Sequence, residues 1–458
     1  MRVLFVSSGL RPHHFGGLPS HVEDVLRGLT ARGVETGYLN TGARFGRSGT
    51  HLREATGFPW RSWILESRWG HTAYWNGTVN PAEQIEPDAA FSSALGTVAR
   101  EFKPDLVHFH EFTSFPIAAA AIFRNAGART IFSAHDFYAL CPTTKLLRRD
   151  GTLCDRPAAG LDCDMCSKHA RPIRHLQFES AWDRRLSFSI RARNVVRRLI
   201  RMTERLVRAR PKREDYQARR ASFVRHLAEF DAVLMTSIDQ MRRFGKYCAA
   251  GTRLHLLPLS RASFATARRP PRTATVNSGR TIFLALNIVN HAKGLHLLEN
   301  AFASLSQTHP CTELHLYGPE GSDSPGIRRL GRYKDSDLDR IIASADFGIL
   351  PSIWPEAYGY VGPEMLSRGL PVIASNLGAM PEYVVDGVNG LLFEPSQSGS
   401  LESAIRETVV DPSLRARLWK GAATGPRQYL TLDQHLDGLM FLYLEVTGKG
   451  ANVSVAIA

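Results

Sequence analysis

Short apolar runs alternate with helical patterns along most of this chain, and this alternation restricts the fold more than any other feature. In the first half, the strand-like runs VLFVS, DLVHFH and TIFSAH alternate with the helical segments SHVEDVLRGLTARG and AAAAIFRNAG. This order is typical of a parallel sheet covered by helices on both faces. Within the first helical segment, we expect Ser20 to cap the helix and Gly33 to end it.

The alternation is interrupted once, at residues 263–280, and then starts again. This stretch is rich in Arg, Pro, Thr and Ser, which fits an exposed linker. Beyond it, strands are expected in TIFLAL, TELHLYG, FGILPS and PVIAS, with helical segments between them. The chain therefore predicts two Rossmann-like α/β domains, at 1–262 and 281–428. Because ligands of such sheets bind outside the carboxyl ends of the strands, we expect a ligand in a cleft between parallel sheets that face each other.

The length and hydropathy of the apolar runs bear on location. With 458 residues, the chain is long enough for two or three domains. No run reaches the roughly 18 apolar residues that a membrane-spanning helix needs. The opening MRVLFVSSGL is too short for the core of a signal peptide and has no small-residue cleavage site, so we expect a buried strand there. These features predict a cytoplasmic protein.

Most of the excess positive charge is concentrated in one segment. Residues 168–220 hold 17 Lys or Arg and 5 Asp or Glu, which gives +12 of the formal net charge of +14. We expect a helical insertion at 168–225, in which Val195, Leu199, Ile200 and Val207 form an apolar stripe. Two interpretations remain open. The segment contacts an anionic membrane surface or acceptor, or it is a solvated helical hairpin whose stripe packs inward.

Four of the six cysteines lie close together in the sequence. These are Cys141, Cys154, Cys163 and Cys166, within a Cys-rich insertion at 141–166. Only the last pair has the two-residue spacing of a zinc knuckle. Four thiolates could hold one structural Zn²⁺ and would leave no open position for chemistry. The alternatives are a pair of disulfides or four reduced, buried thiols. Cys248 and Cys311 are expected to be core residues.

The most informative chemical signal lies in PSIWPEAYGYVGPEML. Glu356 and Glu364 are separated by seven residues, Gly359 lies in the turn between them, and Glu364 begins an apolar helical run. Backbone N–H groups at a helix start favour an anion. A carboxylate on such a helix can accept hydrogen bonds from a ribose diol, and a carboxylate in the loop can bind sugar hydroxyls. The segment therefore predicts a site for a phosphorylated sugar.

With these two glutamates at this spacing, the chain resembles family 4 of the retaining glycosyltransferases, which have the B-type two-domain fold. The following segment, GLPVIASNLGAMPEYVVDGVNGLLF, is similar to the corresponding part of that family. The closing QHLDGLMFLYLEV resembles the family's last helix, expected here at about 430–447, which crosses back onto the first domain. The resemblance implies transfer of a hexose from a nucleotide diphosphate sugar to a saccharide or lipid-linked acceptor, without a catalytic metal.

The resemblance also implies roles for individual residues. Lys293 in AKGLHLL matches the phosphate-binding lysine, Gly16 and Gly17 in FGGLPSHV match the glycine pair near the diphosphate, and His135 in SAHDFY matches the active-site histidine. The catalytic set is then His135, Glu356 and Lys293. The donor-binding set is Gly16, Gly17, Lys293, Glu356, Tyr358, Gly359, Tyr360, Val361 and Glu364.

Two further histidines belong to the same half of the chain. His108 and His110 in DLVHFHEF are expected to be mainly structural and to face opposite sides of their strand. His110 is the one that could reach the cleft.

One departure from the family keeps other functions open. Where the family has a Gly-Arg pair, this chain has Asn287 and Ile288, so one charge that neutralises the diphosphate is missing or supplied elsewhere. A catalytically impaired nucleotide-sugar-binding protein is therefore an alternative, as is transfer to a small-molecule acceptor. A nucleic-acid or anionic-surface binder would use the basic segment, but the chain has no RNA- or DNA-binding motif, and we expect no nucleic-acid partner. The motif set argues against an epimerase or phosphorylase of the same fold.

Overall fold

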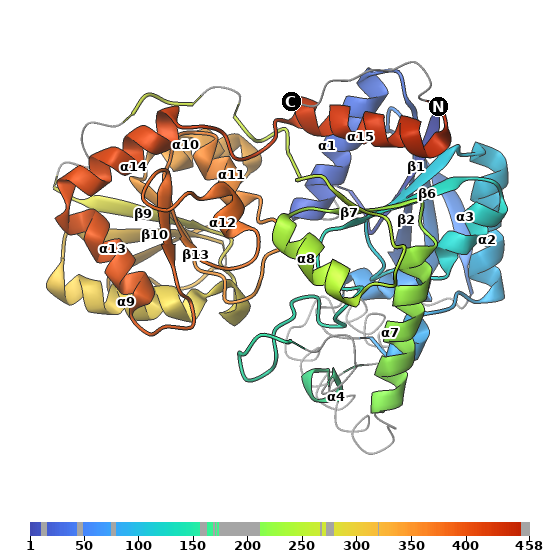
Figure 1. Cartoon of the computed structure of the whole chain (residues 1–458), viewed down its shortest axis with the longest axis horizontal. Helices are drawn as coiled ribbons and strands as arrows, with labels where there is room; N and C mark the ends of the chain where they lie inside the picture. Colours follow the sequence, from blue (N-terminus) through green and yellow to red (C-terminus); the bar gives the residue numbers. More distant parts are fainter. Residues whose placement is uncertain are drawn as a thin grey trace, which may run out of the picture. The chain divides into compact units, whose positions relative to one another are not determined.

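The computed structural model describes residues 1–10, 16–43, 49–74, 79–155, 163–167, 170, 172–173, 211–265, 268–271, 279–318 and 320–449 (Figure 1). The chain divides into two compact units. The first comprises Met1–Met235, Met241–Leu257 and Leu436–Ala458, and the second comprises Thr236–Gln240 and Pro258–His435. Each unit contains one sheet with helices on both faces, which confirms the predicted fold class of two Rossmann-like α/β domains.

The first unit is built on an eight-stranded sheet in the order β3-β4-β2-β1-β5-β6-β7-β8. Its strands are β1 (Arg2–Ser7), β2 (Glu35–Ala43), β3 (His51–Ala55), β4 (Arg61–Ser67), β5 (Leu106–Phe109), β6 (Arg129–Ala134), β7 (Ala232–Met235) and β8 (Leu254–Leu256). Neighbours pair in parallel, except that β3 is antiparallel to β4. The chain runs from β1 to β2 on one side and later returns to β5 on the other. The direction of winding therefore switches between β1 and β5.

The first unit contains nine helical segments among the described residues, and the first of them, α1, starts earlier than predicted. The helical segments are α1 (Gly17–Ala31), η1 (Arg68–Tyr74), η2 (Pro81–Gln84), α2 (Ala89–Phe102), α3 (Ala119–Asn125), α4 (Cys163–Cys166), α7 (Arg213–Ala228), α8 (Ile238–Tyr247) and α15 (Leu432–Thr447). Gly16, at φ 126°, leads into α1, so the helix starts three residues before Ser20 and the predicted cap is wrong. At the other end, Gly33 donates its N–H to the Thr30 carbonyl and ends the helix as expected.

The last helix, α15, packs against the first unit. The Tyr443 hydroxyl lies 2.6 Å from Nδ1 of His108, which is on β5. Near the start of α15, Asp437 accepts a 2.8 Å hydrogen bond from the Arg32 guanidinium. Tyr443 is fully buried. The end of the chain is thus part of the core that its beginning forms.

The second unit is built on a six-stranded sheet in the order β11-β10-β9-β12-β13-β14, with all neighbours parallel. Its strands are β9 (Thr281–Leu286), β10 (Thr312–Tyr317), β11 (Ile327–Gly331), β12 (Phe347–Leu350), β13 (Val372–Ser375) and β14 (Gly390–Phe393). From β9 the chain winds outward to β10 and β11, and then returns to β12 on the other side of β9. The switch of this sheet therefore lies between β9 and β12.

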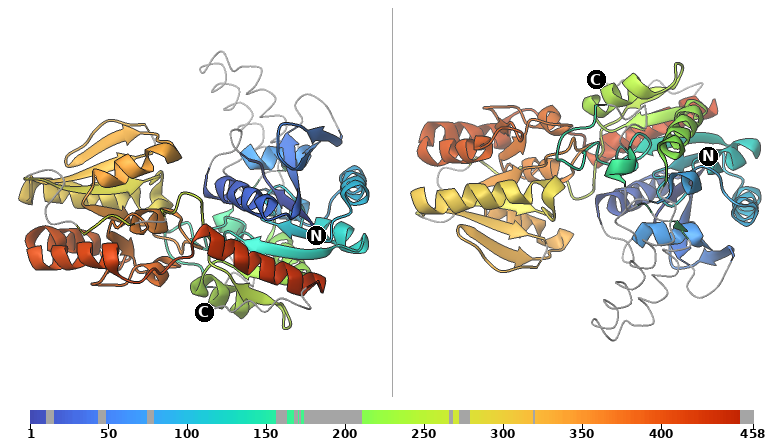
Figure 2. Two further views of the ribbon diagram at one scale, coloured as in Figure 1. Left: turned by 90° about the horizontal axis from the view of Figure 1, so that it is seen from above. Right: turned by 90° about the horizontal axis from the view of Figure 1, so that it is seen from below.

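The core of the second unit follows the two-residue period of its strands. Along β9, Ile282 and Leu284 belong to the hydrophobic cluster on one face, and Phe283 and Ala285 to the cluster on the other. The first face is covered by α10 (Leu338–Ala343), α11 (Val361–Leu366) and α12 (Met380–Tyr383). The second is covered by α9 (Leu295–Thr308), α13 (Ser400–Val410) and α14 (Pro412–Thr424) (Figure 2). Two short 3₁₀ turns, η4 (His291–Lys293) and η5 (Asp335–Asp337), lie between these elements.

The connecting segments differ in part from what the sequence predicts. Phe264 is only 6% exposed and its ring lies 5.9 Å from that of Tyr429, so the start of the predicted linker is packed rather than exposed. Cys311 is exposed, which contradicts its assignment to the core. The apolar stripe predicted within 195–207 lies outside the described residues.

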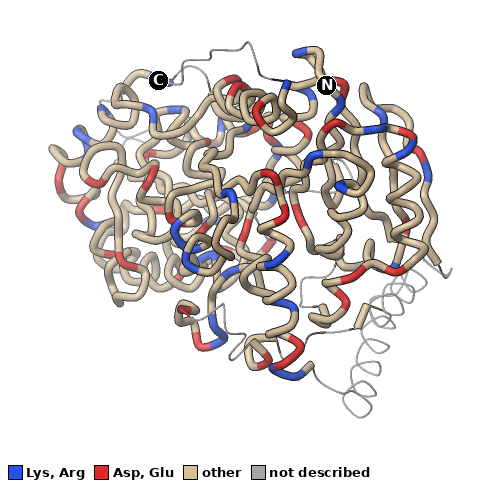
Figure 3. The backbone as a smooth tube through the Cα atoms, turned by 45° about the vertical axis from the view of Figure 1, so that its right-hand side comes forward, with Lys and Arg blue, Asp and Glu red and all other residues tan. Residues whose placement is uncertain are grey.

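Acidic and basic residues are interspersed over both units (Figure 3). Among the described helices, none combines the length and hydropathy that a bilayer crossing needs.

Candidate functional site

Two charged residues meet where the second sheet switches direction. The chain runs from the end of β9 through η4 to Lys293, and from the end of β12 to Glu356. The ammonium Nζ of Lys293 lies 2.6 Å from Oε1 of Glu356. Ligands of open α/β sheets bind outside the carboxyl ends of the strands at such a switch. The pair therefore marks the candidate binding site of the second unit, and it consists of two residues predicted from the sequence.

The surroundings of Glu356 hold this side chain in place. Ser352 donates a 2.6 Å hydrogen bond to Oε1, the same oxygen that faces Lys293. The Glu356 carbonyl accepts the N–H of Ala379 at 3.0 Å, from the loop after β13. In that loop, Gly378 has φ 63°, and a Cβ there would lie 2.6 Å from the backbone N and O of Glu356. Only glycine permits this approach, so the loop fixes the carboxylate through the backbone.

Lys293 is positioned by the glycine that follows it. Gly294 has φ 80°, and an added Cβ would lie 1.8 Å from the Pro351 carbonyl oxygen. The turn that carries Lys293 is therefore pressed against the loop after β12, where any larger side chain would collide with backbone. This close approach brings the lysine within reach of Glu356.

Glu364 forms a second, more deeply buried part of this edge. Gly359, at φ 81°, makes the turn that leads into α11, and Glu364 lies within that helix. Glu364 is 5% exposed as a residue, and its carboxylate accepts a 2.6 Å hydrogen bond from Ser263 and lies 3.8 Å from the Arg261 guanidinium. Burial raises the pKa of Glu364, against the opposing effects of Arg261 and Ser263. The side chain is therefore an oriented acceptor next to a fixed cation.

Arg261 is the residue of this site that the sequence analysis missed. It is 5% exposed and pairs with Asp335 at 3.0 Å as well as facing Glu364. The positions where the family has Gly-Arg do not supply a cation: Asn287 donates to the Tyr333 hydroxyl, and Ile288 is buried in the core. Arg261 stands just before residues assigned to an exposed linker, and nothing in the local pattern distinguishes it from a solvated arginine.

The tyrosines predicted to bind the donor differ in their surroundings. Tyr358 is 6% exposed and packs in the hydrophobic core, with its ring centroid 6.0 Å from that of Tyr383. Tyr360 is partly buried, and the Arg261 guanidinium lies 5.8 Å from its ring centroid. Val361 is partly buried at the start of α11. In this segment the backbone and Tyr360 are available to a ligand, whereas the Tyr358 ring belongs to the core.

Three histidines converge at the carboxyl edge of the first sheet. His110 follows β5, His135 follows β6, and His21 comes from α1. Nδ1 of His110 lies 3.0 Å from Nε2 of His135, and one ligating nitrogen from each of the three rings lies within 4.8 Å of the others. Within the described ranges, no other set of three metal-ligating side chains is as close. We call this set the three-histidine cluster. It can share protons or hold a divalent ion, and it lies beside the switch of this sheet.

The orientation predicted for His108 and His110 is wrong. Their ring centroids are 4.1 Å apart, so both rings lie on the same side of the strand. Residues i and i+2 of a strand share a face, which the prediction of opposite sides overlooked. His108 is structural as expected, because it is buried between Tyr443 and Ser133 at 2.6 and 2.7 Å.

Asp136, next to His135, provides a test of how this edge responds to pH. Burial raises the pKa of Asp136 from 3.8 to about 6. The folded state thus keeps a proton that the unfolded chain releases, and stability falls as pH rises between about 4 and 6. Asp136 is partly exposed, which makes the effect on stability smaller than the full pKa shift would give. We therefore expect Asp136→Asn to remove this pH dependence of the unfolding free energy and to raise that free energy at pH 7 by about 2 kcal/mol. Urea unfolding of both proteins from pH 4.5 to 7.5 measures the difference, and parallel curves would contradict the expectation.

The four clustered cysteines belong to one region of the first unit. All four thiols are free. Cys154 donates its N–H to Leu146 in a small hairpin, and Cys163 and Cys166 stand one turn apart on α4. The pKa of the Cys163 thiol is raised to about 12, chiefly by burial and in addition by the charges of Cys141, Cys154 and Cys166. The sulfurs are close enough to interact, although no three of them lie within 4.8 Å of one another.

Family models match both units of the chain. The model described as Glycosyltransferase Family 4 matches residues 15–259, and the model described as Glycosyl transferases group 1 matches residues 271–424. Glycogen synthase from Mycobacterium tuberculosis is 30% identical over 180 residues, which are 36% of this chain and 41% of that protein. Phosphatidyl-myo-inositol mannosyltransferase from Mycolicibacterium smegmatis is 27% identical over 206 residues, 43% of this chain and 52% of that protein. These matches span about half of the relatives' length or less.

Solved structures resemble the chain over nearly its whole length. Sucrose-phosphate synthase from Thermosynechococcus elongatus has a TM-score of 0.63 at 15% identity and covers 98% of this chain and 100% of its own. HepE from Anabaena, in complex with UDP and glucose, has a TM-score of 0.57 at 15% identity and covers 96% and 98%. The catalytic domain of starch synthase IV from Arabidopsis thaliana, bound to ADP and acarbose, has a TM-score of 0.59 at 13% identity and covers 97% and 99%. At these identities, the likeness concerns the fold.

Proposed function

This chain belongs to glycosyltransferase family 4, and from that premise we propose that it transfers a hexose from a nucleotide diphosphate sugar to a saccharide or lipid-linked acceptor, with retention at the anomeric carbon. The observation that carries the proposal is the contact of Lys293 with Glu356 at the switch of the second sheet, 2.6 Å between Nζ and Oε1. This is the position at which an open α/β sheet binds its ligand. The named neighbours support such a donor, since HepE binds UDP and starch synthase IV binds ADP.

We assign the donor diphosphate to Lys293 and to the backbone N–H groups at the start of α11. Departure of a nucleoside diphosphate gathers negative charge on its oxygens, and fixed positive potential stabilises that charge in the transition state. The Lys293 ammonium forms an ion pair with Glu356. When the donor binds, the ammonium is proposed to turn to the phosphates and Glu356 to accept hydrogen bonds from the sugar hydroxyls.

The nucleoside is assigned to the buried end of the same edge. Glu364 accepts hydrogen bonds from the ribose diol, and the Tyr360 backbone lies beside it. Arg261, held by Asp335 and facing Glu364, supplies a cation that Asn287 and Ile288 do not supply. In this proposal Arg261, from another segment of the chain, replaces the arginine that the family has at the position of Ile288.

The proposed reaction breaks the bond between the anomeric carbon and the phosphate oxygen and forms a bond from the acceptor oxygen on the same face. The departing phosphate takes the proton of the acceptor hydroxyl. The positive groups described above stabilise the leaving diphosphate, so the proposal requires no catalytic metal. Activity is expected to be independent of added divalent metal ions.

The acceptor is assigned to the first unit. In this unit we propose Gly16 and Gly17 as backbone ligands of the donor diphosphate, and His135, which lies 3.0 Å from His110, as the residue that positions the reacting groups. A saccharide or lipid-linked acceptor, and thus a role in polysaccharide or glycoconjugate synthesis, is supported by the relatives named glycogen synthase and phosphatidyl-myo-inositol mannosyltransferase. The basic segment 168–225 would bring a cytoplasmic enzyme to the anionic membrane surface.

Glu364 gives the sharpest test of nucleotide binding. A ligand at about 100 times its Kd raises the unfolding free energy by about 2.7 kcal/mol. We expect one of UDP, GDP, ADP and TDP to raise the Tm of the wild-type protein, and Glu364→Gln to weaken that binding about tenfold, because the amide replaces one acceptor by a donor. Glu402→Gln, on α13, is the matched control and should bind as the wild type does. If none of the four nucleotides shifts the Tm, the donor assignment is wrong.

Because Ile288 stands where the family has an arginine, a protein that binds the nucleotide sugar without transferring it is the alternative. A measurement of turnover distinguishes the enzyme from this alternative. A catalytically impaired nucleotide-sugar-binding protein would show the same Tm shift with the matching nucleotide sugar. It would, however, neither hydrolyse nor transfer the sugar when saccharide or lipid-linked acceptors are supplied. Product formation above that of Lys293→Ala supports the enzyme.

We also propose that the four clustered cysteines hold one structural Zn²⁺. Their common location, the one-turn spacing of Cys163 and Cys166, and the Arg149 N–H that donates to the Cys166 sulfur support this assignment. Side-chain rotation must draw the sulfurs together to ligand distances. We expect about one zinc per chain by elemental analysis and about none in Cys163→Ser, with Cys248→Ser as the control that keeps the metal. Wild-type protein purified without zinc would contradict the proposal.

A further inference from the structure

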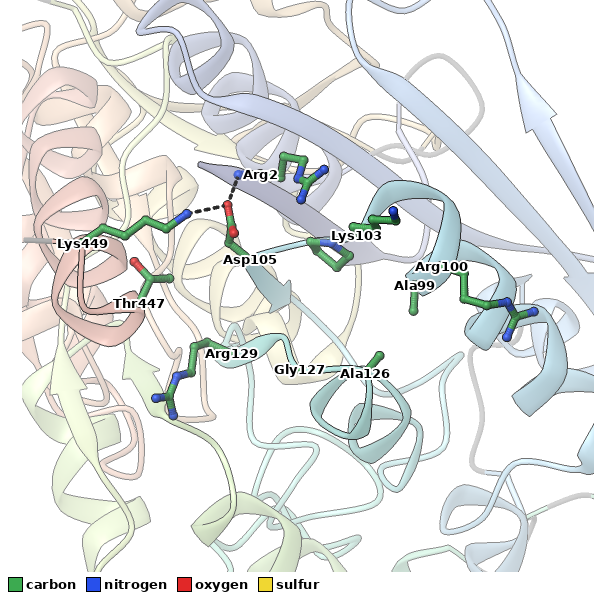
Figure 4. Close-up of a pocket in the computed structure, with 11 residues that line it drawn as sticks. Arg2, Ala99, Arg100, Lys103, Asp105, Ala126, Gly127, Arg129, Thr447 and Lys449 are labelled. Atoms are coloured by element: carbon green, nitrogen blue, oxygen red, sulfur yellow. Dashed lines mark hydrogen bonds and ion pairs between the residues drawn. The ribbon is translucent and has the colours of Figure 1, made fainter.

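A basic pocket lies at the amino ends of the first sheet, away from the three-histidine cluster (Figure 4). It has a volume of about 790 Å³, within the range of small-molecule pockets. Residues from the starts of β1, β5 and β6, from the ends of α2 and α3, and from the end of α15 line it. We call it the amino-end pocket. Its charged residues are Arg2, Arg100, Lys103, Asp105, Arg129 and Lys449.

The positive charge of this pocket exceeds the carboxylates that face it. Asp105 accepts the Arg2 N–H at 2.7 Å and the Lys449 ammonium at 2.9 Å. Arg129 pairs with Asp231 at 3.0 Å. In the part of the chain that the structure describes, the side chains of Arg2, Arg100 and Lys103 form no ion pair. Three cations therefore line the pocket without an acidic partner.

Stabilisation of helix ends accounts for only part of this charge. The helices α2, α3 and α15 all end at the pocket, and each helix C-terminus carries roughly half a negative charge, which nearby cations stabilise. Three such ends together offset about one and a half of the three unpaired positive charges. A net positive potential remains in a concave site, where low-dielectric walls strengthen it.

From this excess charge we propose that the amino-end pocket binds a phosphate group, either of a small phosphorylated molecule or of an anionic lipid headgroup. The Arg2 guanidinium provides the forked donors that match phosphate oxygens, and Lys103 provides a point charge. The Arg100 guanidinium donates to Thr97 Oγ1 at 3.1 Å, so it must turn away from its own helix to contact the phosphate (Figure 4). Lys103 has φ 49°, and this left-handed turn at the end of α2 places it at the pocket.

The pocket is separate from the proposed donor site. β5 joins the two edges of the first sheet, and about five residues at roughly 3.3 Å each, or some 16 Å, separate Asp105 from His110. Lys293 and Glu356 belong to the second unit. A ligand in the amino-end pocket therefore does not replace the sugar donor, and the inference does not depend on the proposed transfer.

The test measures binding of inorganic phosphate by calorimetry to four proteins, the wild type and three variants. The pocket variant is Arg100→Gln with Lys103→Asn, where asparagine tolerates the left-handed conformation. The control, Arg406→Gln with Lys420→Gln, removes two exposed cations from the second unit. Lys293→Ala removes the proposed phosphate ligand of the donor site. We expect the pocket variant to weaken phosphate binding about tenfold, and the control and Lys293→Ala to keep it.

Sedimentation with vesicles then separates the two sources of phosphate. If phosphatidylglycerol vesicles, but not phosphatidylcholine vesicles, bind the control more strongly than the pocket variant, the ligand is a lipid headgroup. If both variants bind vesicles equally while phosphate binding differs, the ligand is a free phosphorylated molecule. Equal phosphate binding by the pocket variant and the control overturns the proposal. Loss of phosphate binding only in Lys293→Ala overturns it as well, and leaves the donor site as the place of binding.

Discussion

Lys293→Ala is expected to lower kcat/KM for sugar transfer about a thousandfold, equivalent to about 4 kcal/mol of transition-state stabilisation. The ammonium is the one side-chain cation at the switch of the second sheet, among the described residues, that reaches Glu356, 2.6 Å away. Because the lysine side chain is 33% exposed, loss of the ion pair should cost only about 1 kcal/mol of folding free energy. Steady-state kinetics and the Tm, measured on the same preparation, test both parts.

Two further variants separate chemistry from folding. Glu356→Ala should also abolish most transfer, since it removes the proposed ligand of the sugar hydroxyls. In the double variant Lys293→Ala with Glu356→Gln, no buried charge is left unpaired, so stability should recover while activity stays low. The losses in activity should not add, because the two residues act on one ligand. Lys420→Ala is the control for charge. Full activity in both single variants would refute the assigned roles.

Gly294→Ala is expected to lower the unfolding free energy by about 3 kcal/mol, the largest effect on stability that a single methyl group should produce here. Alanine at φ 80° is strained, and its Cβ would lie 1.8 Å from the Pro351 carbonyl oxygen. The turn must then move away from the loop after β12 and take Lys293 with it, so transfer should also fall. Urea unfolding gives the free energy, and kinetics give the loss of activity.

Gly399→Ala isolates the contribution of the collision. Gly399 has φ 77°, nearly that of Gly294, but no atom lies within 4 Å of its added Cβ. This control should therefore lose only about 1 kcal/mol, the strain of a left-handed alanine. If Gly294→Ala and Gly399→Ala lower the unfolding free energy equally, the close packing of the Lys293 turn does not contribute to stability.

The sheets could be predicted because their strands are buried on both faces. β9 is buried at all six positions, and after Thr281 its sequence, TIFLAL, is an uninterrupted apolar run that ends at the polar Asn287. Lys293 and Glu356 could also be predicted from the sequence, because each follows an apolar strand and parallel strands bring their carboxyl ends to one edge of the sheet. Starts of helices were less certain: Ser20 has the right chemistry for a cap, but Gly16 makes the turn into α1.

Residues that act through distant packing could not be predicted. Arg261 stands beside a polar linker, and its role depends on Glu364 and Asp335, 103 and 74 residues further along the chain. His21 faces His110 and His135 only because α1 begins at Gly17, which fixes the side of the helix on which the ring lies. In both cases the local pattern is ordinary, and only the tertiary structure makes the residue part of a site.

The packing of α15 has a consequence for how the polypeptide matures on the ribosome. Tyr443 completes the surroundings of His108, yet it is translated more than three hundred residues later, after the entire second unit. The second unit can thus close while the first still lacks a buried helix, although amino-terminal domains usually finish first during synthesis. Until α15 has been synthesised, the face of the nascent first sheet that α15 covers remains exposed. This is the longest interval in which a chaperone can bind that face.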